Sequence, residues 1–260
     1  MSELDGVLAV VCASADEAYR SALASHSHRE LAALVADGAD GTPTMRIDVL
    51  VESAIVDALA AFGVNVLSEE AGFIDRGSAR TVVVDPVDGS ANAAAGVPVC
   101  AVSAALAVDG RFTEAATRLL GTDRVWSARV GDDRGLRTSG RRDLRGADLS
   151  LLRPRDGTKA AWNRLASAAE RVRVLGCSTL DAALVAAGSV DAFVDPGGEV
   201  HRLVDLAAAA VMVPAAGGVV TDVHRRPVEL DLDLTRRWSG VVAATPELAD
   251  AIIAMVLAPS

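Results

Sequence analysis

The segment Thr81-Val82-Val83-Val84-Asp85-Pro86-Val87-Asp88-Gly89-Ser90 joins a β-branched run to two carboxylates and a turn. Its first half predicts a strand over 81–85, because β-branched runs bounded by turn residues are typical of strands. Two carboxylates three residues apart at a strand end can converge on one hard cation, and Mg²⁺ prefers oxygen ligands. Gly89 and Ser90 would offer backbone N–H groups at a helix N-terminus, where anions bind. The segment therefore predicts a metal and a phosphate meeting at one place, with an ordinary Asp/Gly turn as the alternative.

Acidic residues also stand beside two other apolar runs. Glu69 and Glu70 follow the run 64–67, so a strand would deliver them to a loop. Asp205 stands at the start of the apolar stretch 204–213, which predicts a helix. Alone, such an acidic pair is more often part of a solvated surface, and a plain helix N-cap is the alternative for Asp205. Taken singly, these residues leave both alternatives open.

The rest of the N-terminal half alternates between helical and strand patterns. Apolar residues at helical spacing predict helices over 7–23 and 49–62. Between them, the run 38–44 is rich in turn formers and predicts a surface loop. An apolar stretch over 99–108 ends at an Asp-Gly pair, which is a hairpin signal. Strands should therefore dominate residues 80–130.

The C-terminal half predicts a layered α/β arrangement. Strands are expected over 171–175, 190–194 and 218–222, with helices over 179–187 and 204–213 between them. The polar, arginine-rich run 131–146 is the best candidate for a seam. We therefore divide the chain into an N-terminal α+β portion, 1–140, and a C-terminal α/β portion, 141–260, that completes the site.

Composition excludes several classes of partner. The 260 residues include 35 acidic and 25 basic ones, for a net charge of −10. Such a balance excludes nucleic-acid or anionic-membrane binding by bulk electrostatics. Cys12, Cys100 and Cys177 form neither a disulfide framework nor a zinc motif, and no basic region opens a signal peptide, so a cytoplasmic location is expected.

Together the acidic segments resemble the inositol monophosphatase superfamily of magnesium-dependent, lithium-sensitive phosphatases. The resemblance rests on 68–70 (Ser-Glu-Glu), 85–90 and 204–208 (Val-Asp-Leu-Ala-Ala), followed by 215–218 (Ala-Ala-Gly-Gly). The archaeal-type subgroup, which combines inositol monophosphatase and fructose-1,6-bisphosphatase activities, is more similar still, at 38–44, 64–70 and 171–176. The implied fold is an α/β/α/β/α sandwich, and a homodimer is usual in the family.

Carried over residue by residue, the resemblance implies a set of ligands for two to three Mg²⁺ ions. The two main ions would be bound by the carboxylates of Glu69, Asp85, Asp88 and Asp205 and by the Val87 carbonyl. Asp40 would bind a weaker third ion, with Asp48 as a supporting acid nearby. Glu69, Asp88 and Ser90 would be catalytic, and Glu69 and the Ser90 hydroxyl would orient the attacking water.

The substrate would lie along a second group of residues. Gly89 and Ser90 would contact the phosphate, Gly176, Cys177 and Ser178 would lie along the polyol, and Arg202 could reach a second phosphate. The segment 195–202, Asp-Pro-Gly-Gly-Glu-Val-His-Arg, has glycine and glutamate where related sequences tend to place basic residues. On this ground we expect monophosphates to be preferred over bisphosphates.

The expected function is therefore that of a Mg²⁺-dependent phosphatase acting on a sugar, cyclitol or related phosphate monoester. Five carboxylates would repel a phosphate ester, so cations must be interposed. Fructose-1,6-bisphosphatase, or a sugar or nucleoside phosphate phosphatase of a specialised pathway, is an alternative. A catalytically inactive scaffold of the same fold is the alternative from another class.

Overall fold

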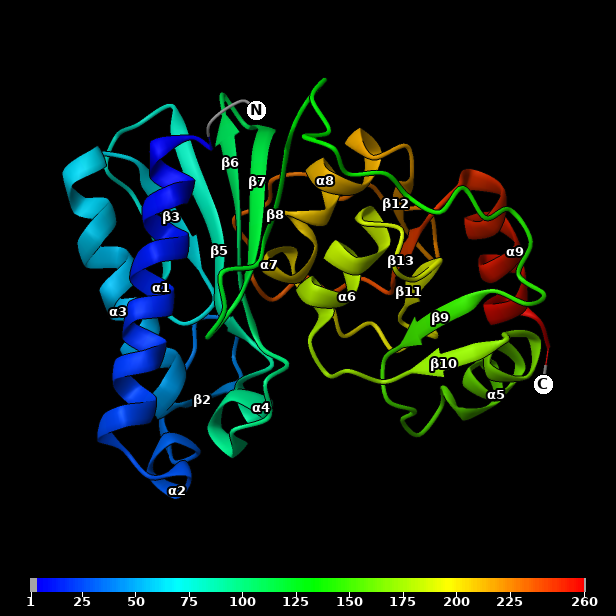
Figure 1. Cartoon of the computed structure of the whole chain (residues 1–260), viewed down its shortest axis with the longest axis horizontal. Helices are drawn as coiled ribbons and strands as arrows, with labels where there is room; N and C mark the ends of the chain where they lie inside the picture. The colour runs from blue at the N-terminus through cyan, green and yellow to red at the C-terminus, as the bar shows by residue number, and fades with distance from the viewer. Residues whose placement is uncertain (1–3, 260) are drawn as a thin grey trace.

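Two β-rich parts of the chain form two separate sheets, with helices on both faces of each. The computed structural model describes residues 4–259, and Figure 1 shows the layers in the order α/β/α/β/α. This order arises because each helix buries one apolar stripe and each sheet needs cover on both faces. The predicted layered sandwich is confirmed.

The first sheet has six strands in the order β4-β3-β5-β6-β7-β8. β3 and β5 run parallel, and the other neighbours are antiparallel. A hairpin at Asp109-Gly110 joins β6 to β7, as predicted. Its strands are β3 (Asn65–Ser68), β4 (Gly72–Ile74), β5 (Arg80–Asp88), β6 (Ala101–Val108), β7 (Arg111–Leu119) and β8 (Val125–Arg129).

Helices α1 (Gly6–Ser25) and α3 (Arg46–Leu59) cover the outer face of this sheet. The Asp5 carboxylate accepts a hydrogen bond of 2.9 Å from Val7 N and so begins α1. The predicted second helix begins three residues earlier than expected and ends in a short 3₁₀ turn, η1 (Ala60–Phe62). The short helices α2 (His28–Leu31) and α4 (Ser90–Ala95) lie beyond their ends.

The second sheet has five strands in the order β10-β9-β11-β13-β12. Helices α5 (Lys159–Ala168) and α9 (Pro246–Leu257) pack on its outer face. The strands are β9 (Asp148–Leu151), β10 (Arg171–Arg173), β11 (Ala192–Val194), β12 (Val219–Asp222) and β13 (Gly240–Ala243). The run 131–146 connects β8 to β9 without a helix or strand. A domain boundary there stays a prediction.

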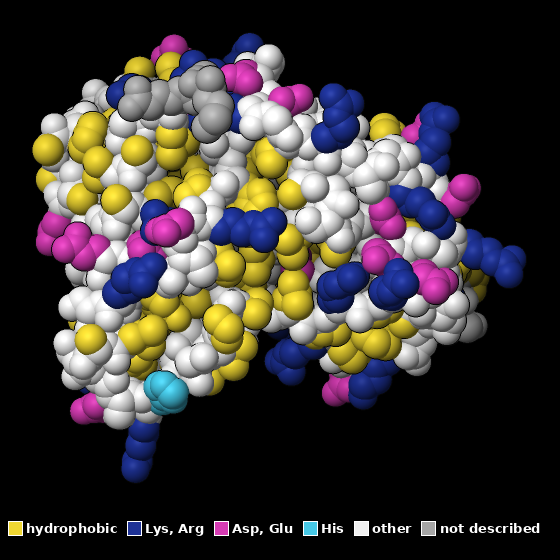
Figure 2. All heavy atoms as spheres, in the orientation of Figure 1, with side chains coloured by type: hydrophobic (Ala, Val, Ile, Leu, Met, Phe, Trp, Pro, Cys, Tyr) yellow, Lys and Arg dark blue, Asp and Glu magenta, His cyan; other side chains and the backbone are white. Residues whose placement is uncertain are grey.

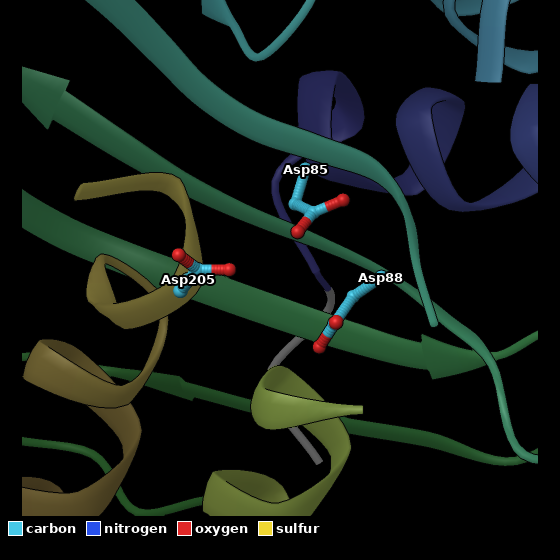
Figure 3. A group of neighbouring side chains, drawn as sticks. All are labelled: Asp85, Asp88 and Asp205. Atoms are coloured by element: carbon cyan, nitrogen blue, oxygen red, sulfur yellow. The ribbon is translucent and has the colours of Figure 1, made fainter. Parts of the chain in front are cut away.

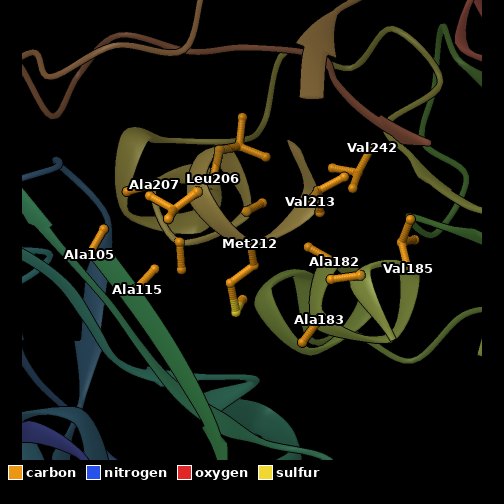
Figure 4. Close-up of a cluster of buried hydrophobic side chains, with 14 of the residues drawn as sticks. Ala105, Ala115, Ala182, Ala183, Val185, Leu206, Ala207, Met212, Val213 and Val242 are labelled. Carbon is orange, nitrogen blue, oxygen red and sulfur yellow. The ribbon is translucent and has the colours of Figure 1, made fainter. Parts of the chain in front are cut away.

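The middle layer consists of α6 (Ser178–Ala186), α7 (Leu203–Leu206) and α8 (Ala209–Ala215), and it is shared by both sheets. Figure 4 shows Met212 between Ala115 of the first sheet and Ala183 of α6, with Val213 beside Val242. The small side chains let the helices approach the first sheet closely. The prediction of a single helix over 204–213 was wrong, because a turn at residues 207–208 separates α7 from α8.

The predicted surface loop 38–44 was also wrong in part. Its residues form the turn and second strand of a hairpin, β1 (Leu34–Asp37) and β2 (Pro43–Met45). Asp40 and Thr44 are buried, 3% and 1% exposed. Burial of these polar side chains is tolerated because both are hydrogen-bonded. The Thr42 backbone N–H donates to the Asp40 carboxylate, and the Thr44 hydroxyl donates to the Glu70 carboxylate.

One face of the molecule carries both signs of charge. In Figure 2, acidic and basic side chains are interspersed and hydrophobic ones gather along the middle of the molecule. Within residues 4–259, no helix combines the length and the apolar character that crossing a bilayer requires.

Candidate active site

A β-bulge brings Asp85 and Asp88 to one side of β5. Asp85 pairs with Ser103 of β6 and Asp88 pairs with Ala101, so two residues of β5 face one residue of β6 between them. Pro86 lies inside this bulge, where its missing N–H is tolerated. In a regular strand, residues three apart point to opposite faces. The extra residue cancels that alternation, and the two carboxylates converge.

The turn after Asp88 requires glycine. Gly89 has a φ of +83°, and a Cβ there would lie 2.9 Å from the Val99 carbonyl oxygen. Gly89 is the N-cap of α4, and the next residue, Ser90, donates its hydroxyl to the Val87 carbonyl at 2.9 Å. The predicted strand, turn and helix are therefore all present at this segment.

Asp205 approaches the β5 carboxylates from the middle layer. Figure 3 shows the three side chains directed toward one another, and ligand oxygens of Asp85, Asp88 and Asp205 all lie within 4.8 Å of one another. Asp205 is not the N-cap that the sequence allowed. It occupies the third position of α7 and accepts a hydrogen bond of 2.6 Å from the backbone N–H of Arg202, which is the N-cap residue.

Within residues 4–259, Asp85 is buried without a polar partner for its carboxylate. It is 1% solvent-exposed, and neither carboxylate oxygen has a hydrogen-bond partner among the described residues. Burial raises the pKa of Asp85 well above its usual value, and the charges of Glu69 and Asp88 raise it further. A buried carboxylate without a partner is costly. The donor set of buried oxygens therefore fits a hard cation.

Glu69 reaches the cluster from β3. Because β3 and β5 are parallel with Ser68 opposite Val84, Glu69, the first residue after β3, comes next to Asp85 of β5. Burial raises the pKa of Glu69 to about 8. Glu70 points elsewhere and accepts a hydrogen bond from Thr44.

The guanidinium of Arg202 lies among the carboxylates. It donates to Asp40 Oδ2 at 2.8 Å and to Asp205 Oδ2 at 3.1 Å, and it also forms an ion pair with Glu69. Its side chain is 17% exposed. Burial would lower the pKa of Arg202, but the charges of Asp205 and Glu69 raise it. Arg202, expected near the substrate, is thus the internal cation of the acidic cluster.

Asp40 and Asp48 flank this group. Burial acts to raise the pKa of Asp40, but hydrogen bonds from Thr42 and Arg202 hold it below its usual value. Burial raises the pKa of Asp48 to about 6, while the adjacent Ser90 hydroxyl opposes this. Asp48 also accepts a hydrogen bond of 3.1 Å from Met45 N, so it supports the start of α3.

The N-terminus of α6 holds Asp88 in place. Thr179 N donates to Asp88 Oδ2 at 2.5 Å, and Cys177 Sγ donates to the Asp88 carbonyl at 3.3 Å. Cys177 is fully buried and burial raises the pKa of its thiol, which excludes it as a nucleophile. Sequence reasoning missed Thr179, although its place in the first turn of an expected helix was a usable signal.

Two adjoining pockets open beside the acidic cluster. One, of about 440 Å³, has Asp40, Gly198, Arg202 and Arg237 in its wall; the other, of about 350 Å³, has Asp88, Gly176 and Ser178. Arg155 lines both, and Arg153 lines the second. Sequence analysis did not single out Arg153, Arg155 or Arg237, because no motif marks them.

Comparison with known proteins identifies the family of the chain. A family model described as the inositol monophosphatase family matches residues 3–258. The chain belongs to this family. The resemblance stated from the sequence is therefore confirmed, as is the enzyme class, a phosphoric monoester hydrolase.

Members of the inositol monophosphatase family from archaea and bacteria are among its relatives. A fructose-1,6-bisphosphatase/inositol-1-monophosphatase of Thermococcus kodakarensis is 34% identical, over 84% of this chain and 85% of that protein. The inositol-1-monophosphatase ImpA of Mycolicibacterium smegmatis is 32% identical, over 81% and 78%. The crystal structure of the MJ0109 gene product, an inositol monophosphatase–fructose 1,6-bisphosphatase, aligns with a TM-score of 0.84 at 25% identity, covering 98% of this chain and all of that one.

Proposed function

We propose that this chain is a Mg²⁺-dependent phosphatase that hydrolyses a sugar, cyclitol or related phosphate monoester. The bare carboxylate of Asp85, surrounded by Glu69, Asp88 and Asp205, is the observation that carries the proposal. A protein of net charge −10 can hold a phosphate at such a cluster only when cations neutralise it.

Two to three Mg²⁺ ions would be held by Glu69, Asp85, Asp88, Asp205 and the Val87 carbonyl, with Asp40 at the edge of the cluster. When bound, the ions would activate the attacking water and neutralise charge on the phosphate and the leaving alkoxide. Glu69 and Ser90 would orient that water. The Ser90 hydroxyl lies beside two acceptors, the Val87 carbonyl at 2.9 Å and the Asp48 carboxylate.

The substrate contacts are assigned to Gly89, Ser90, Gly176, Cys177 and Ser178. Gly176 and Ser178 line the pocket next to Asp88. Because the Cys177 thiol is buried against the Asp88 carbonyl, that residue would contact a ligand through its backbone only. The pocket next to Asp88 has the size of a small-molecule site.

The alcohol half of the ester is the open part of the proposal. An inositol 1-phosphate-like monoester is the first candidate, and fructose 1,6-bisphosphate is the alternative favoured by the arginines that line the pockets. A homodimer, a cytoplasmic location and lithium sensitivity stay predictions from the resemblance.

A panel of phosphate esters tests the proposal. Purified protein is assayed for phosphate release from inositol 1-phosphate, fructose 1,6-bisphosphate, a nucleoside 5′-phosphate and adenosine 3′,5′-bisphosphate, with Mg²⁺ or with EDTA. Turnover of at least one ester that needs Mg²⁺ is expected. Activity that survives EDTA, or none on any ester with Mg²⁺, would contradict the proposal.

A further inference from the structure

Asn92 of α4 ties together segments of the active site that are far apart in the sequence. Its side-chain amide donates to the Val99 carbonyl at 2.8 Å, seven residues ahead, and to the Leu175 carbonyl at 2.9 Å, 83 residues ahead. The neighbouring backbone is closely packed as well, since a Cβ at Gly89 would lie 3.1 Å from the Gly176 carbonyl oxygen. One side chain therefore fixes the start of α4 against the segment that leads into α6.

These hydrogen bonds decide which way the amide group of Asn92 faces. Both amide N–H groups donate to carbonyl oxygens, and an oxygen in their place would face two acceptors. The Oδ1 atom is therefore fixed on the other branch of the amide, and none of the described residues donates a hydrogen bond to it. The side chain is half-buried in the wall of the pocket of about 350 Å³. An oriented acceptor in this wall thus has no donor among the described residues.

The other polar side chains of this wall have different chemistry. Arg153 and Arg155 can only donate hydrogen bonds, and Asp88 is assigned to the metal. The Ser178 hydroxyl can donate or accept, and it makes no hydrogen bond to the described residues. Among the described side chains of the wall, the uncharged acceptors are therefore Asn92 Oδ1 and the Ser178 hydroxyl. A hydroxyl of a bound ligand needs such an acceptor for its proton.

We propose that Asn92 determines substrate choice by accepting a hydrogen bond from a hydroxyl of the alcohol half of the ester. Asp88 and Asn92 line the same pocket, so an ester whose phosphate lies at the acidic cluster extends its alcohol half past Asn92. An ester without that hydroxyl leaves the acceptor desolvated and unpaired, which disfavours its binding. The ligand class is a polyol monoester with a hydroxyl at this position, and the inference rests on the proposed phosphatase function.

The test removes the hydroxyl and the acceptor separately. kcat/KM is measured at one saturating Mg²⁺ concentration for inositol 1-phosphate, or for the ester of the panel that is hydrolysed fastest, and for the monodeoxy analogues of that ester. With wild type, one analogue should be about 10-fold poorer than the parent ester, mainly through KM. With Asn92→Ala that difference should shrink to within about twofold, because the hydroxyl has lost its acceptor. Asn92→Ser, which can still donate to one backbone carbonyl but lacks Oδ1, gives the same readout if the alanine variant does not fold.

Asn163→Ala is the matched control. Asn163 is exposed on α5 and its side chain makes no hydrogen bond to a described residue, so this variant should keep the wild-type difference between esters. A merely structural role for Asn92 would lower kcat/KM equally for the parent ester and every analogue. That equal loss, or a wild type for which no analogue is more than about twofold poorer, overturns the role of Asn92 while the phosphatase function stands. If wild type hydrolyses no ester of the panel with Mg²⁺, the proposed function fails instead.

Discussion

Replacing Arg202 by methionine should destabilise the metal-free enzyme and tighten its binding of Mg²⁺. Arg202 forms ion pairs with Asp40, Glu69 and Asp205, which are also proposed metal ligands. The arginine and the metal therefore compete for the same carboxylates. Methionine keeps much of the aliphatic volume and removes the charge.

The size of the effect follows from the burial of these groups. Removing one partner of a buried ion pair costs about 3 to 5 kcal/mol, because a charge is left without compensation. The Arg202 side chain is 17% exposed, so the lower end of that range applies. About 3 kcal/mol lowers the melting temperature of a chain of this size by roughly 6 to 12 °C. If the same energy no longer opposes Mg²⁺ binding, the Kd should fall by about 100-fold.

Two measurements without substrate check this reasoning. Thermal unfolding in EDTA gives the cost in the metal-free state, and isothermal titration calorimetry with MgCl₂ gives the affinity. Arg202→Lys, which keeps a charge but not the forked geometry, should lie between wild type and Arg202→Met. An unchanged Kd together with an unchanged melting temperature in EDTA would refute the idea that Arg202 competes with the metal.

Three further changes give simpler expectations. Asp88→Asn should cut turnover by at least about 10²-fold while circular dichroism shows an intact fold, because a metal held by its ligands stabilises charge in the transition state by several kcal/mol. A near-normal kcat would mean that Asp88 is a turn residue only. Asp40→Ala should raise the Mg²⁺ concentration needed for half-maximal rate, with only a small change in melting temperature. An unchanged dependence of the rate on Mg²⁺ would remove Asp40 from the site. Burial raises the pKa of Asp181 to about 8. Between about pH 4 and pH 8 the folded state therefore binds a proton at Asp181 that the unfolded state does not bind, so the free energy of unfolding falls as the pH rises through this range. In Asp181→Asn the side-chain oxygen can still accept the hydrogen bond from Ser150, but the side chain does not titrate. The melting temperature of the variant minus that of wild type should therefore rise from pH 5 to pH 8. A constant difference would contradict the raised pKa of Asp181.

Local patterns were enough to predict the layers of the fold and most of the acidic residues. The run 81–90 encodes its own strand, bulge and turn, because proline and β-branched residues restrict the backbone nearby and Gly89 permits the positive φ of the turn. Burial of Asp40 was not predictable from the turn formers around it. That burial depends on Arg202, which lies 162 residues further along the chain.

The charge balance of the site is what the sequence could not supply. Arg202 reaches Glu69 across 133 residues, and Arg155 joins the same pocket from a connection that carries no motif. A count of charges along 195–202 therefore covered only part of the pocket wall, since residues at 40–42, 155 and 237 line the same pocket. Motifs locate the residues whose chemistry is constrained locally, whereas the arginines that line the two pockets carry no motif, and only the fold brings them beside the acidic cluster.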